Sequence, residues 1–403
     1  MRIGIDGSCL ANRRGFGRFA RQAVRALSEA RSPHEFVVLI DRPSLDTSAP
    51  YVPGGFETVV VDVGEAPASA ASSAGRRRVG DMFAMGRAAG RSRLDLFYFP
   101  ATYSFFPIWN AGRVVVTMHD TLALARPELV FPSWQGRVAW ALKEHAAARL
   151  ADLILTVSEA ARRDLIAWFR LPDDRVRVVT EGAASVFGPR PPGPVGDEAL
   201  ARHGLRPCGR YFLYVGGLSP HKNLPRLIEA YARTGLSTEG VRLVLVGDTA
   251  DVFHTHVPEL RAAVERFGLG DSVSFTGFVP DEDLVHVYNR AEALVQPSLM
   301  EGFGLPPVEA MACGTPVASS TAGSLPEVVG DAGLFFEPTD VAAIASALRL
   351  IADTPSLRAE LSRRAAARAS VYSWSAAAQD LLAAFEDVAG PASTGGPARR
   401  RSA

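Results

Sequence analysis

Short hydrophobic runs alternate with helical patterns along the first half of the chain. Apolar residues recur three and four positions apart in segments such as Phe19–Leu27 and Ala160–Phe169, which predicts amphipathic helices. The strand-like runs between the helices are Arg2–Asp6, Phe36–Ile40, Thr58–Val63, Leu94–Phe99, Val114–His119, Leu153–Ser158 and Val176–Thr180. Because these runs are apolar almost throughout, they are typical of strands covered on both faces of a parallel sheet.

The second half repeats this alternation. Its strand-like runs are Tyr211–Gly216, Val241–Gly247, Ser272–Thr276, Ala293–Gln296, Pro316–Ala318 and Gly333–Phe336. Its helical stretches are Leu224–Thr234, Pro258–Phe267, Asp281–Ala291, Val341–Ala352, Ser356–Tyr372 and Ser375–Val388. The predicted fold class is therefore α/β, with two doubly wound parallel sheets that face each other across a cleft. Ligands of such sheets bind beyond the carboxyl ends of the strands, so we expect the chemistry in that cleft.

A stretch rich in proline and glycine separates the two halves. Residues 187–196 read FGPRPPGPVG, and no regular hydrophobic pattern continues through them. We therefore expect a first domain over residues 1–188, a linker over 189–207 and a second domain over 208–374. A last helix over 375–390 is expected to return to the first domain. The tail 391–403, rich in Gly, Pro, Ser and Arg, is predicted to be disordered.

Composition narrows the functional classes. With 403 residues, 47% of them hydrophobic and 21% charged, the chain has the balance of a globular enzyme. The net charge is zero, so no overall positive field would hold a nucleic acid. The three cysteines, Cys9, Cys208 and Cys313, are far apart and predict neither a disulfide framework nor a zinc site. A cytoplasmic location is expected, while the sequence leaves the oligomeric state open.

Membrane contact is expected to be peripheral at most. No apolar run approaches the roughly 20 residues needed to span a bilayer. The basic segment Arg76–Arg93 carries Met82, Phe83 and Met85 at about helical spacing, a pattern that can lie on a lipid surface. The alternative, favoured by its many Ala and Gly residues, is an ordinary helix that packs Met and Phe inward.

The most informative segment runs from Glu301 to Glu309, EGFGLPPVE. It follows a predicted strand and leads into a predicted short helix over Val308–Cys313. Gly302 and Gly304 let the backbone come close to a ligand, and the free N–H groups of a helix N-terminus suit a phosphate or diphosphate. The segment therefore predicts a site for a phosphorylated ligand.

The two glutamates of this segment have different expected roles. Glu309 is predicted in the first turn of the helix, where a carboxylate can accept hydrogen bonds from both hydroxyls of a ribose. Glu301 lies before the loop, near the phosphate end. The alternative is that Glu309 only complements the helix dipole and Glu301 is a solvated loop residue. The surrounding Gly-x-Gly-x-Pro-Pro frame favours the functional interpretation.

Three further groups lie at predicted strand ends facing the cleft. Lys222, in the turn Gly216–Asn223, offers a cation to a diphosphate, and Gly217 on the same turn is expected to contact the donor. Gly15 and Gly17 form a G-x-G after the first strand, which alone is weak evidence for phosphate binding. The third group is His119 and Asp120, which close a strand of the first domain. For Lys222, a surface lysine near a helix start is the alternative; for His119 and Asp120, it is a buried hydrogen-bonded pair.

Other enzyme classes lack their motifs. The chain has no H-E-x-x-H, no G-x-S-x-G, no Walker G-x-x-x-x-G-K-[ST] and no clustered metal-ligand spacing. The sequence thus gives no support to a hydrolase, a zinc enzyme or a nucleoside triphosphatase.

With these residues in hand, the chain resembles the retaining nucleotide-sugar glycosyltransferases of glycosyltransferase family 4. The resemblance spans nearly the whole chain and is most specific over Pro297–Val317 and Ser324–Gly330, which look like the family's E-x7-E region. It implies the GT-B fold of two Rossmann-like domains, a nucleoside-diphosphate sugar as donor, no cofactor and no metal for catalysis. The acceptor would be a hydroxyl of a saccharide, a lipid-linked or a small-molecule compound.

The resemblance also implies roles for individual residues. Glu301 would meet the donor sugar, Glu309 the ribose, Lys222 the diphosphate, and His119 would line the acceptor side. The other residues implied in donor contact are Gly302, Phe303, Gly304, Leu305, Gly15, Gly17, Phe278 and Val279. On the acceptor side we further expect Asp120, Tyr103 and Trp109, although aromatic residues there are equally compatible with a core.

One departure from the family concerns the second phosphate contact. Many relatives carry an arginine on the turn before the lysine, whereas Gly217 and His221 stand in that region here. Arg13, Arg14 and Arg18 are alternatives that could supply the charge from across the cleft, and the sequence does not choose among them.

The resemblance favours a hexosyltransferase that retains the anomeric configuration. GDP-mannose is the first expectation for the donor, followed by UDP- or dTDP-sugars. A GT-B sugar-nucleotide epimerase and a non-catalytic sugar-nucleotide-binding protein are the alternatives. The presence of Glu301, Glu309 and Lys222 argues against the non-catalytic alternative.

Overall fold

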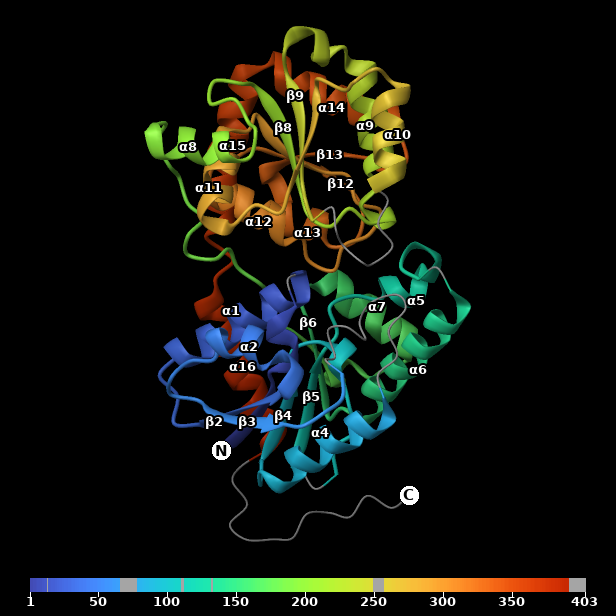
Figure 1. Ribbon diagram of the computed structural model, residues 1–403, viewed down its shortest axis with the longest axis vertical. Helices are drawn as coiled ribbons and strands as arrows, with labels where there is room; N and C mark the ends of the chain where they lie inside the picture. The colour runs from blue at the N-terminus through green and yellow to red at the C-terminus, as the bar shows by residue number, and fades with distance from the viewer. Residues whose placement is uncertain (13, 66–77, 110–111, 132, 249–256, 391–403) are drawn as a thin grey trace.

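The fold was analysed in a computed structural model, which describes residues 1–12, 14–65, 78–109, 112–131, 133–248 and 257–390. Two α/β domains lie one above the other, each built on a parallel sheet (Figure 1). This confirms the predicted fold class. The expected tail 391–403 lies outside the described residues.

The first sheet has seven parallel strands in the order β3-β2-β1-β4-β5-β6-β7. Their bounds are β1 Arg2–Asp6, β2 Glu35–Asp41, β3 Glu57–Val61, β4 Leu96–Phe99, β5 Arg113–Thr117, β6 Leu153–Thr156 and β7 Val176–Val178. Within strand β2, Val38 packs toward the side of α1 (Gly15–Glu29), while Val37 and Leu39 pack toward α4 (Val79–Arg91) and α6 (Trp134–Leu150). Both faces are therefore buried, as the apolar runs predict.

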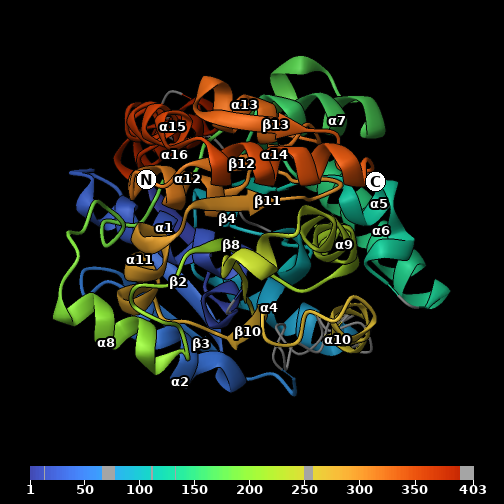
Figure 2. The same cartoon turned by 90° about the horizontal axis from the view of Figure 1, so that it is seen from above.

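The second sheet has six parallel strands in the order β10-β9-β8-β11-β12-β13. Their bounds are β8 Tyr211–Val215, β9 Arg242–Val246, β10 Val273–Gly277, β11 Ala293–Gln296, β12 Val317–Ser320 and β13 Gly333–Phe336. Seen from above, α9 and α10 lie on one side of β8, and α8 and α11 lie on the other (Figure 2). In both sheets the order reverses direction beside the first strand of the domain, which places a ligand crevice there.

The remaining helices complete the two layers around each sheet. In the first domain they are α2 Leu45–Ser48, α5 Leu122–Ala125 and α7 Glu159–Phe169. In the second part of the chain they are α8 Pro194–Arg202, α9 Leu224–Thr234, α10 Val257–Arg266, α11 Asp281–Arg290, α12 Leu305–Ala312, α13 Leu325–Val329, α14 Val341–Asp353, α15 Pro355–Ala369 and α16 Trp374–Ala389. Among the described residues, none of these helices has the length and apolar character required to cross a bilayer.

The segment 189–207, predicted as a linker rich in proline and glycine, contains helix α8. Pro194 occupies the first turn of the helix, where its missing N–H costs no hydrogen bond. The helix packs against α11, and Arg290 Nη2 lies 2.7 Å from Asp197 Oδ1. A proline that looks like a break in the sequence therefore starts a helix.

The last helix, α16, lies against the first domain rather than the second. It packs along α1, with the Trp374 ring 5.7 Å from Phe19 and the Phe385 ring 5.1 Å from Tyr98. Phe385 is fully buried. The chain thus crosses between the two domains twice, once before the strands of the second sheet and once after them.

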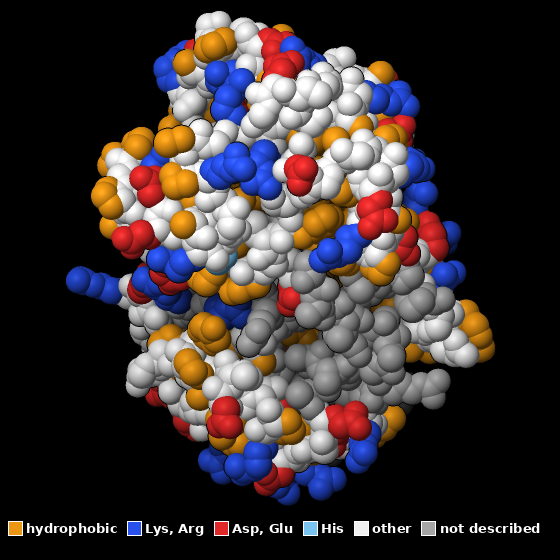
Figure 3. All heavy atoms as spheres, turned by 45° about the horizontal axis from the view of Figure 1, so that its top comes forward, with side chains coloured by type: hydrophobic (Ala, Val, Ile, Leu, Met, Phe, Trp, Pro, Cys, Tyr) orange, Lys and Arg blue, Asp and Glu red, His pale blue; other side chains and the backbone are white. Residues whose placement is uncertain are grey.

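Surface charge follows the balanced composition. Basic and acidic side chains are interspersed over the face shown in Figure 3, with no broad field of one sign.

We expect Phe385→Ala to destabilise the first domain by about 3–5 kcal/mol, because it leaves a cavity between α16 and β4. Urea unfolding followed by circular dichroism measures this loss. Leu350→Ala, at a half-exposed position of α14, is the matched control, for which we expect a change within about 0.5 kcal/mol. Equal effects of the two substitutions would show that α16 does not contribute to this core.

Candidate functional site

The loop between β11 and α12 forms the floor of the candidate site. Gly304 has a φ of +104°, and a Cβ atom there would lie 2.8 Å from Leu325, so only glycine fits. Gly302 lies against the first domain, since a Cβ atom there would be 2.3 Å from the carbonyl oxygen of His119. The backbone therefore comes close to a neighbouring residue at both glycines, within the second domain at Gly304 and across the domain boundary at Gly302.

Helix α12 begins at Leu305, three residues earlier than predicted. Pro306 and Pro307 then lie in its first turn, where they have no N–H groups to offer. Glu309 consequently lies in the second turn rather than the first. The helix includes both prolines because proline is favoured in a first turn.

Glu301 and Lys222 form a buried ion pair beside this loop. Lys222 Nζ donates hydrogen bonds to both carboxylate oxygens of Glu301, at 2.7 and 2.9 Å. Oε1 also accepts from Gln296 at 2.7 Å and from Ser298 at 2.6 Å. Burial opposes ionisation of Glu301, but the charge of Lys222 and the hydrogen bonds from Lys222 and Ser298 keep the pKa of Glu301 below its usual value. Glu301 is therefore a carboxylate at neutral pH.

The turn that carries Lys222 is fixed to the loop by neighbouring residues. Asn223 has a left-handed backbone and donates to the carbonyl oxygens of Pro297 and Pro338, at 3.0 and 2.7 Å. The carbonyl oxygen of Gly217 accepts from Tyr214 at 2.6 Å. Burial lowers the pKa of His221 to about 3, so its ring is neutral and does not replace the arginine found in many relatives.

Glu309 is buried deeper and has a different environment. Its Oε2 accepts a hydrogen bond of 2.9 Å from the hydroxyl of Tyr288. Its Oε1 lies 2.8 Å from Nη2 of Arg18 but accepts no aligned hydrogen bond within the described part of the chain. Burial raises the pKa of Glu309 to about 7, against the opposing effect of Arg18. The two oxygens of this carboxylate thus differ, because Oε2 accepts a hydrogen bond whereas Oε1 faces a cation.

His119 and Asp120 approach the loop from the first domain. His119 Nε2 lies 3.1 Å from the carbonyl oxygen of Pro100, to which it donates, and its ring packs edge-on against Phe19 at 4.7 Å. Burial raises the pKa of Asp120, whose Oδ1 accepts from the Leu122 N–H at 2.8 Å. The predicted residues of the two domains therefore meet at the carboxyl ends of the two sheets.

Sequence reasoning missed Glu181, a buried carboxylate of this site. Its Oε1 lies 3.7 Å from Nδ1 of His119. The available signal was its place directly after β7, because all strands of a parallel sheet end at the same edge. Arg18, which the sequence offered only as one of three alternatives, pairs with Glu309, whereas Arg13 lies outside the described residues.

The two glycines before and within α1 differ in their surroundings. A Cβ atom on Gly15 would meet nothing within 4 Å, so this position has open space in front of it. A Cβ atom on Gly17 would lie 1.8 Å from the carbonyl oxygen of Asn12. Gly17 is thus required by packing, while Gly15 leaves room for a ligand.

Comparisons with known proteins identify the family of the chain. The profile described as Glycosyl transferases group 1 matches residues 197–368, and that described as Glycosyl transferase 4-like domain matches residues 14–182. O-antigen chain mannosyltransferase B of Escherichia coli is 36% identical over 287 residues, covering 70% of this chain and 72% of that protein. The chain belongs to the family-4 type of glycosyltransferases.

Other relatives are matched over less of their length. D-inositol 3-phosphate glycosyltransferase of Acidothermus cellulolyticus is 35% identical over 59% of this chain and 53% of its own.

Among solved structures, sucrose-phosphate synthase of Thermosynechococcus elongatus has a TM-score of 0.73 at 22% identity, covering 96% of this chain and 98% of that one. HepE of Anabaena in complex with UDP-glucose has a TM-score of 0.72 at 20% identity, with coverages of 95% and 98%. These structures share the GT-B fold.

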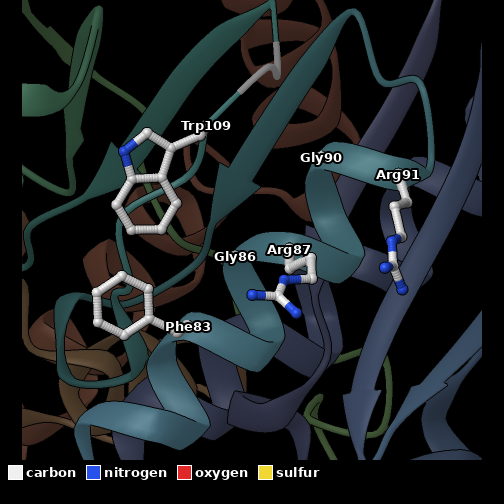
Figure 4. Close-up of a pocket in the computed structure, with 6 residues that line it drawn as sticks. All are labelled: Phe83, Gly86, Arg87, Gly90, Arg91 and Trp109. Carbon is white, nitrogen blue, oxygen red and sulfur yellow. The ribbon is translucent and has the colours of Figure 1, made fainter.

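The other residues expected at the glycosyltransferase site differ in their surroundings. Tyr103 is buried in the core of the first domain. Trp109 stacks on Phe83 at 5.2 Å beside an outer hollow of about 380 Å³ (Figure 4). Phe278 is exposed, whereas Val279 is buried.

The membrane interpretation of the segment Arg76–Arg93 falls on partly described residues. Met85 of α4 is buried and Met82 packs against the same core, as the inward-packing alternative expects, but Phe83 is half-exposed.

Among the described residues, no group of three or more His, Cys, Asp or Glu side chains is placed to hold a metal ion.

A second contact between the domains lies beside the loop of Glu301. Glu327, in the first turn of α13, accepts hydrogen bonds from the backbone N–H groups of Glu159 and Ala160 at 2.8 and 2.9 Å. Ser158, the N-cap of α7, donates to the carbonyl oxygen of Gly302 at 2.6 Å. A carboxylate at a helix N-terminus satisfies free N–H groups and complements the helix dipole. The N-terminus of α7 is therefore capped by the opposite domain.

We expect Glu327→Ala to open the two domains relative to each other, because two N–H groups of α7 lose their acceptor across the cleft. Small-angle scattering should show a larger radius of gyration. Asp340→Ala is the matched control, since Asp340 accepts two N–H groups of α14 within one domain. Scattering profiles that match in the two variants would contradict a role of Glu327 in holding the domains together.

Proposed function

We propose that the chain is a retaining, metal-independent hexosyltransferase that uses a nucleoside-diphosphate sugar. Residues 208–374 would bind the donor and residues 1–188 the acceptor. The observation that carries the proposal is the pair of buried carboxylates at the ends of one loop and helix. Glu301 is ion-paired with Lys222. Oε1 of Glu309 lies 2.8 Å from Arg18 Nη2 but accepts no aligned hydrogen bond among the described residues.

In this proposal Glu309 binds the ribose. Its Oε2 is held by Tyr288, so the hydroxyl of the ribose would donate to the buried Oε1. A buried acceptor without a donor is costly, which gives a hydroxyl-bearing ligand a strong contact there. The backbone of Val279 and Phe278, beyond β10, would then lie beside the base.

The loop Gly302–Leu305 would hold the two phosphates. Pro306 and Pro307 have no backbone N–H groups. The donors would therefore be the backbone N–H groups of this loop and of Val308. Lys222 would move from Glu301 toward the diphosphate or contact both, and Gly15 leaves space for the donor on the opposite side. Glu301, released in part from Lys222, would accept hydrogen bonds from hydroxyls of the sugar.

The proposed reaction forms one bond and breaks one bond on the same face of the sugar. The oxygen of the acceptor hydroxyl attacks the anomeric carbon as the bond to the diphosphate breaks. The proton of that hydroxyl passes to the departing phosphate oxygen, giving the nucleoside diphosphate and the glycosylated acceptor. The protein contributes position and charge, through Lys222 and the loop, while His119 and Asp120 line the acceptor side.

The donor we propose first is GDP-mannose. Support comes from the mannosyltransferases among the relatives, including O-antigen chain mannosyltransferase B. UDP-sugars come next, because the structure of HepE is a complex with UDP-glucose. The acceptor is a hydroxyl on a saccharide, a lipid-linked or a small-molecule compound.

We expect Lys222→Ala to lower turnover about 100-fold or more, because the growing charge of the leaving diphosphate loses its cation. The substitution also leaves Glu301 buried and unpaired, which costs about 3–5 kcal/mol of stability. The double variant Lys222→Ala/Glu301→Gln removes that charge and keeps the fold for comparison. Wild-type turnover in a folded Lys222→Ala variant, measured with a saturating donor, would exclude the proposed role.

A thermal-shift screen of GDP-mannose, UDP-glucose and dTDP-glucose tests the donor. The nucleotide sugar that binds should stabilise the wild type by about 2.7 kcal/mol at 100 times its Kd. Glu309→Gln should lose most of this stabilisation. If none of the three compounds shifts the unfolding transition, the proposed donor class is wrong.

The stereochemistry and the metal requirement are tested on the product. We expect NMR to show the anomeric configuration of the donor in the product, and EDTA to leave turnover unchanged. Incubation of the donor without acceptor is the control for epimerase activity. Epimerised donor, an inverted product or loss of activity in EDTA would each contradict the corresponding part of the proposal.

A further inference from the structure

Arg18 reaches from the first domain to the carboxylate proposed to bind ribose. It lies in the first turns of α1, and its side chain is largely buried. Its Nη2 donates a hydrogen bond of 2.9 Å to Asp281 Oδ2 on α11 and lies 2.8 Å from Glu309 Oε1 on α12. Both partners belong to the second domain, so this single guanidinium joins α1 to two helices across the cleft.

The position of Arg18 is fixed from several sides. Its guanidinium lies over the ring of Phe187, 5.4 Å from the centroid, in the segment between the two domains. Gly17, the residue before it, is pressed against Asn12, which sets where α1 begins. These contacts fix the side chain of Arg18 within the interface between the domains.

Burial and two neighbouring carboxylates oppose the negative charge of Glu309, whereas Arg18 and the hydrogen bond from Tyr288 favour it. The charged and titratable groups that face it are Asp281 and Tyr288 from α11, Glu181 from beyond β7, Cys313 on its own helix and Arg18. Burial is the main cause that raises the pKa of Glu309, and Asp281 and Glu181 raise it further. Arg18 is the cation among these groups and lowers it.

We propose that Arg18 is a positioning residue of the donor site, which holds the Glu309 carboxylate in place for the ribose hydroxyl and thereby completes the donor site from the acceptor domain. The inference rests on the proposed function. It differs from the sequence-based alternative in which Arg18 contacts a phosphate, because Arg18 lies at the ribose end and Lys222 at the other.

A pH dependence follows from the geometry. Glu309 has a raised pKa near 7, so the ionised form that accepts a hydroxyl hydrogen bond is lost as the pH falls through this value. Without Arg18, the pKa of Glu309 rises further, and the same loss begins at a higher pH. Both phosphates of a nucleotide sugar keep their charge between about pH 6 and 9, so they do not contribute to this profile.

The experiment measures the Kd of GDP-mannose and of UDP-glucose by calorimetry from about pH 6 to pH 9. For Arg18→Gln we expect a Kd about tenfold above that of the wild type at pH 7, because loss of a close opposite charge raises a carboxyl pKa by about one unit or more. The difference should narrow as the pH rises. Arg18→Lys keeps the charge and should restore most of the profile.

Two control variants separate this role from a structural one. Arg25→Gln changes an exposed arginine of the same helix that pairs with Glu29, and its profile should match the wild type. Glu309→Gln should bind weakly at every pH without the titration, and adding Arg18→Gln to it should cause no further loss. Circular dichroism checks that each variant is folded.

The outcomes distinguish the inference from the function on which it rests. If the wild type binds neither nucleotide sugar, the proposed function fails and takes the inference with it. If the wild type binds but Arg18→Gln has the same Kd at every pH, only the inference fails. Tighter binding by Arg18→Gln would also overturn it, because Arg18 would then compete with the ribose for Glu309.

Discussion

Two buried carboxylates on one loop and helix, each of which needs a cation, define the architecture of the site. Glu301 takes Lys222 from its own domain, and Glu309 takes Arg18 from the opposite one. An unpaired buried carboxylate is so unfavourable that its partner must be placed with it. The turn after β8 and the start of α1 are therefore tied to the segment between β11 and α12.

The contrast between the two pairs separates two kinds of chemistry. Glu301 accepts four hydrogen bonds, two of them from Lys222, and is held ionised. Glu309 has one such bond, from Tyr288, and remains close to the point of protonation at neutral pH. A saturated carboxylate suits an electrostatic role near a reacting sugar, whereas an incompletely satisfied one suits recognition of a hydroxyl.

The fold was predictable because its signal is local. Each strand of the two sheets is an apolar run, and the observed β1, β11 and β13 have the predicted bounds. Boundaries failed where proline was involved, at α8 and at the start of α12, because proline both ends and begins helices. Hydrophobic periodicity does not distinguish these two uses.

The site was predictable in part, for a related reason. Glu301, Glu309, Lys222 and His119 lie at strand ends or in turns, and the topology of a parallel sheet brings such positions together. The sequence did not indicate the surroundings of Trp109, because aromatic residues carry no signal of the face on which they lie. The place of Glu181 after β7 was a signal that the sequence reasoning did not use. The sequence could not predict the partner of Arg18, because this ion pair depends on how the two domains meet.

That meeting of domains gives the site a property that neither domain has alone. The second domain supplies Glu309 and Gly302, while the first supplies Arg18, the carbonyl oxygen of His119 and the N-cap Ser158. Around Gly302, the two domains meet through a hydrogen bond and backbone packing. At Glu309, the contact between the domains is an ion pair. Because both sides close on the same segment, separation of the domains would expose a carboxylate without its cation and a helix without its cap. The physical cost of these unpaired groups favours the arrangement in which donor and acceptor surfaces face each other.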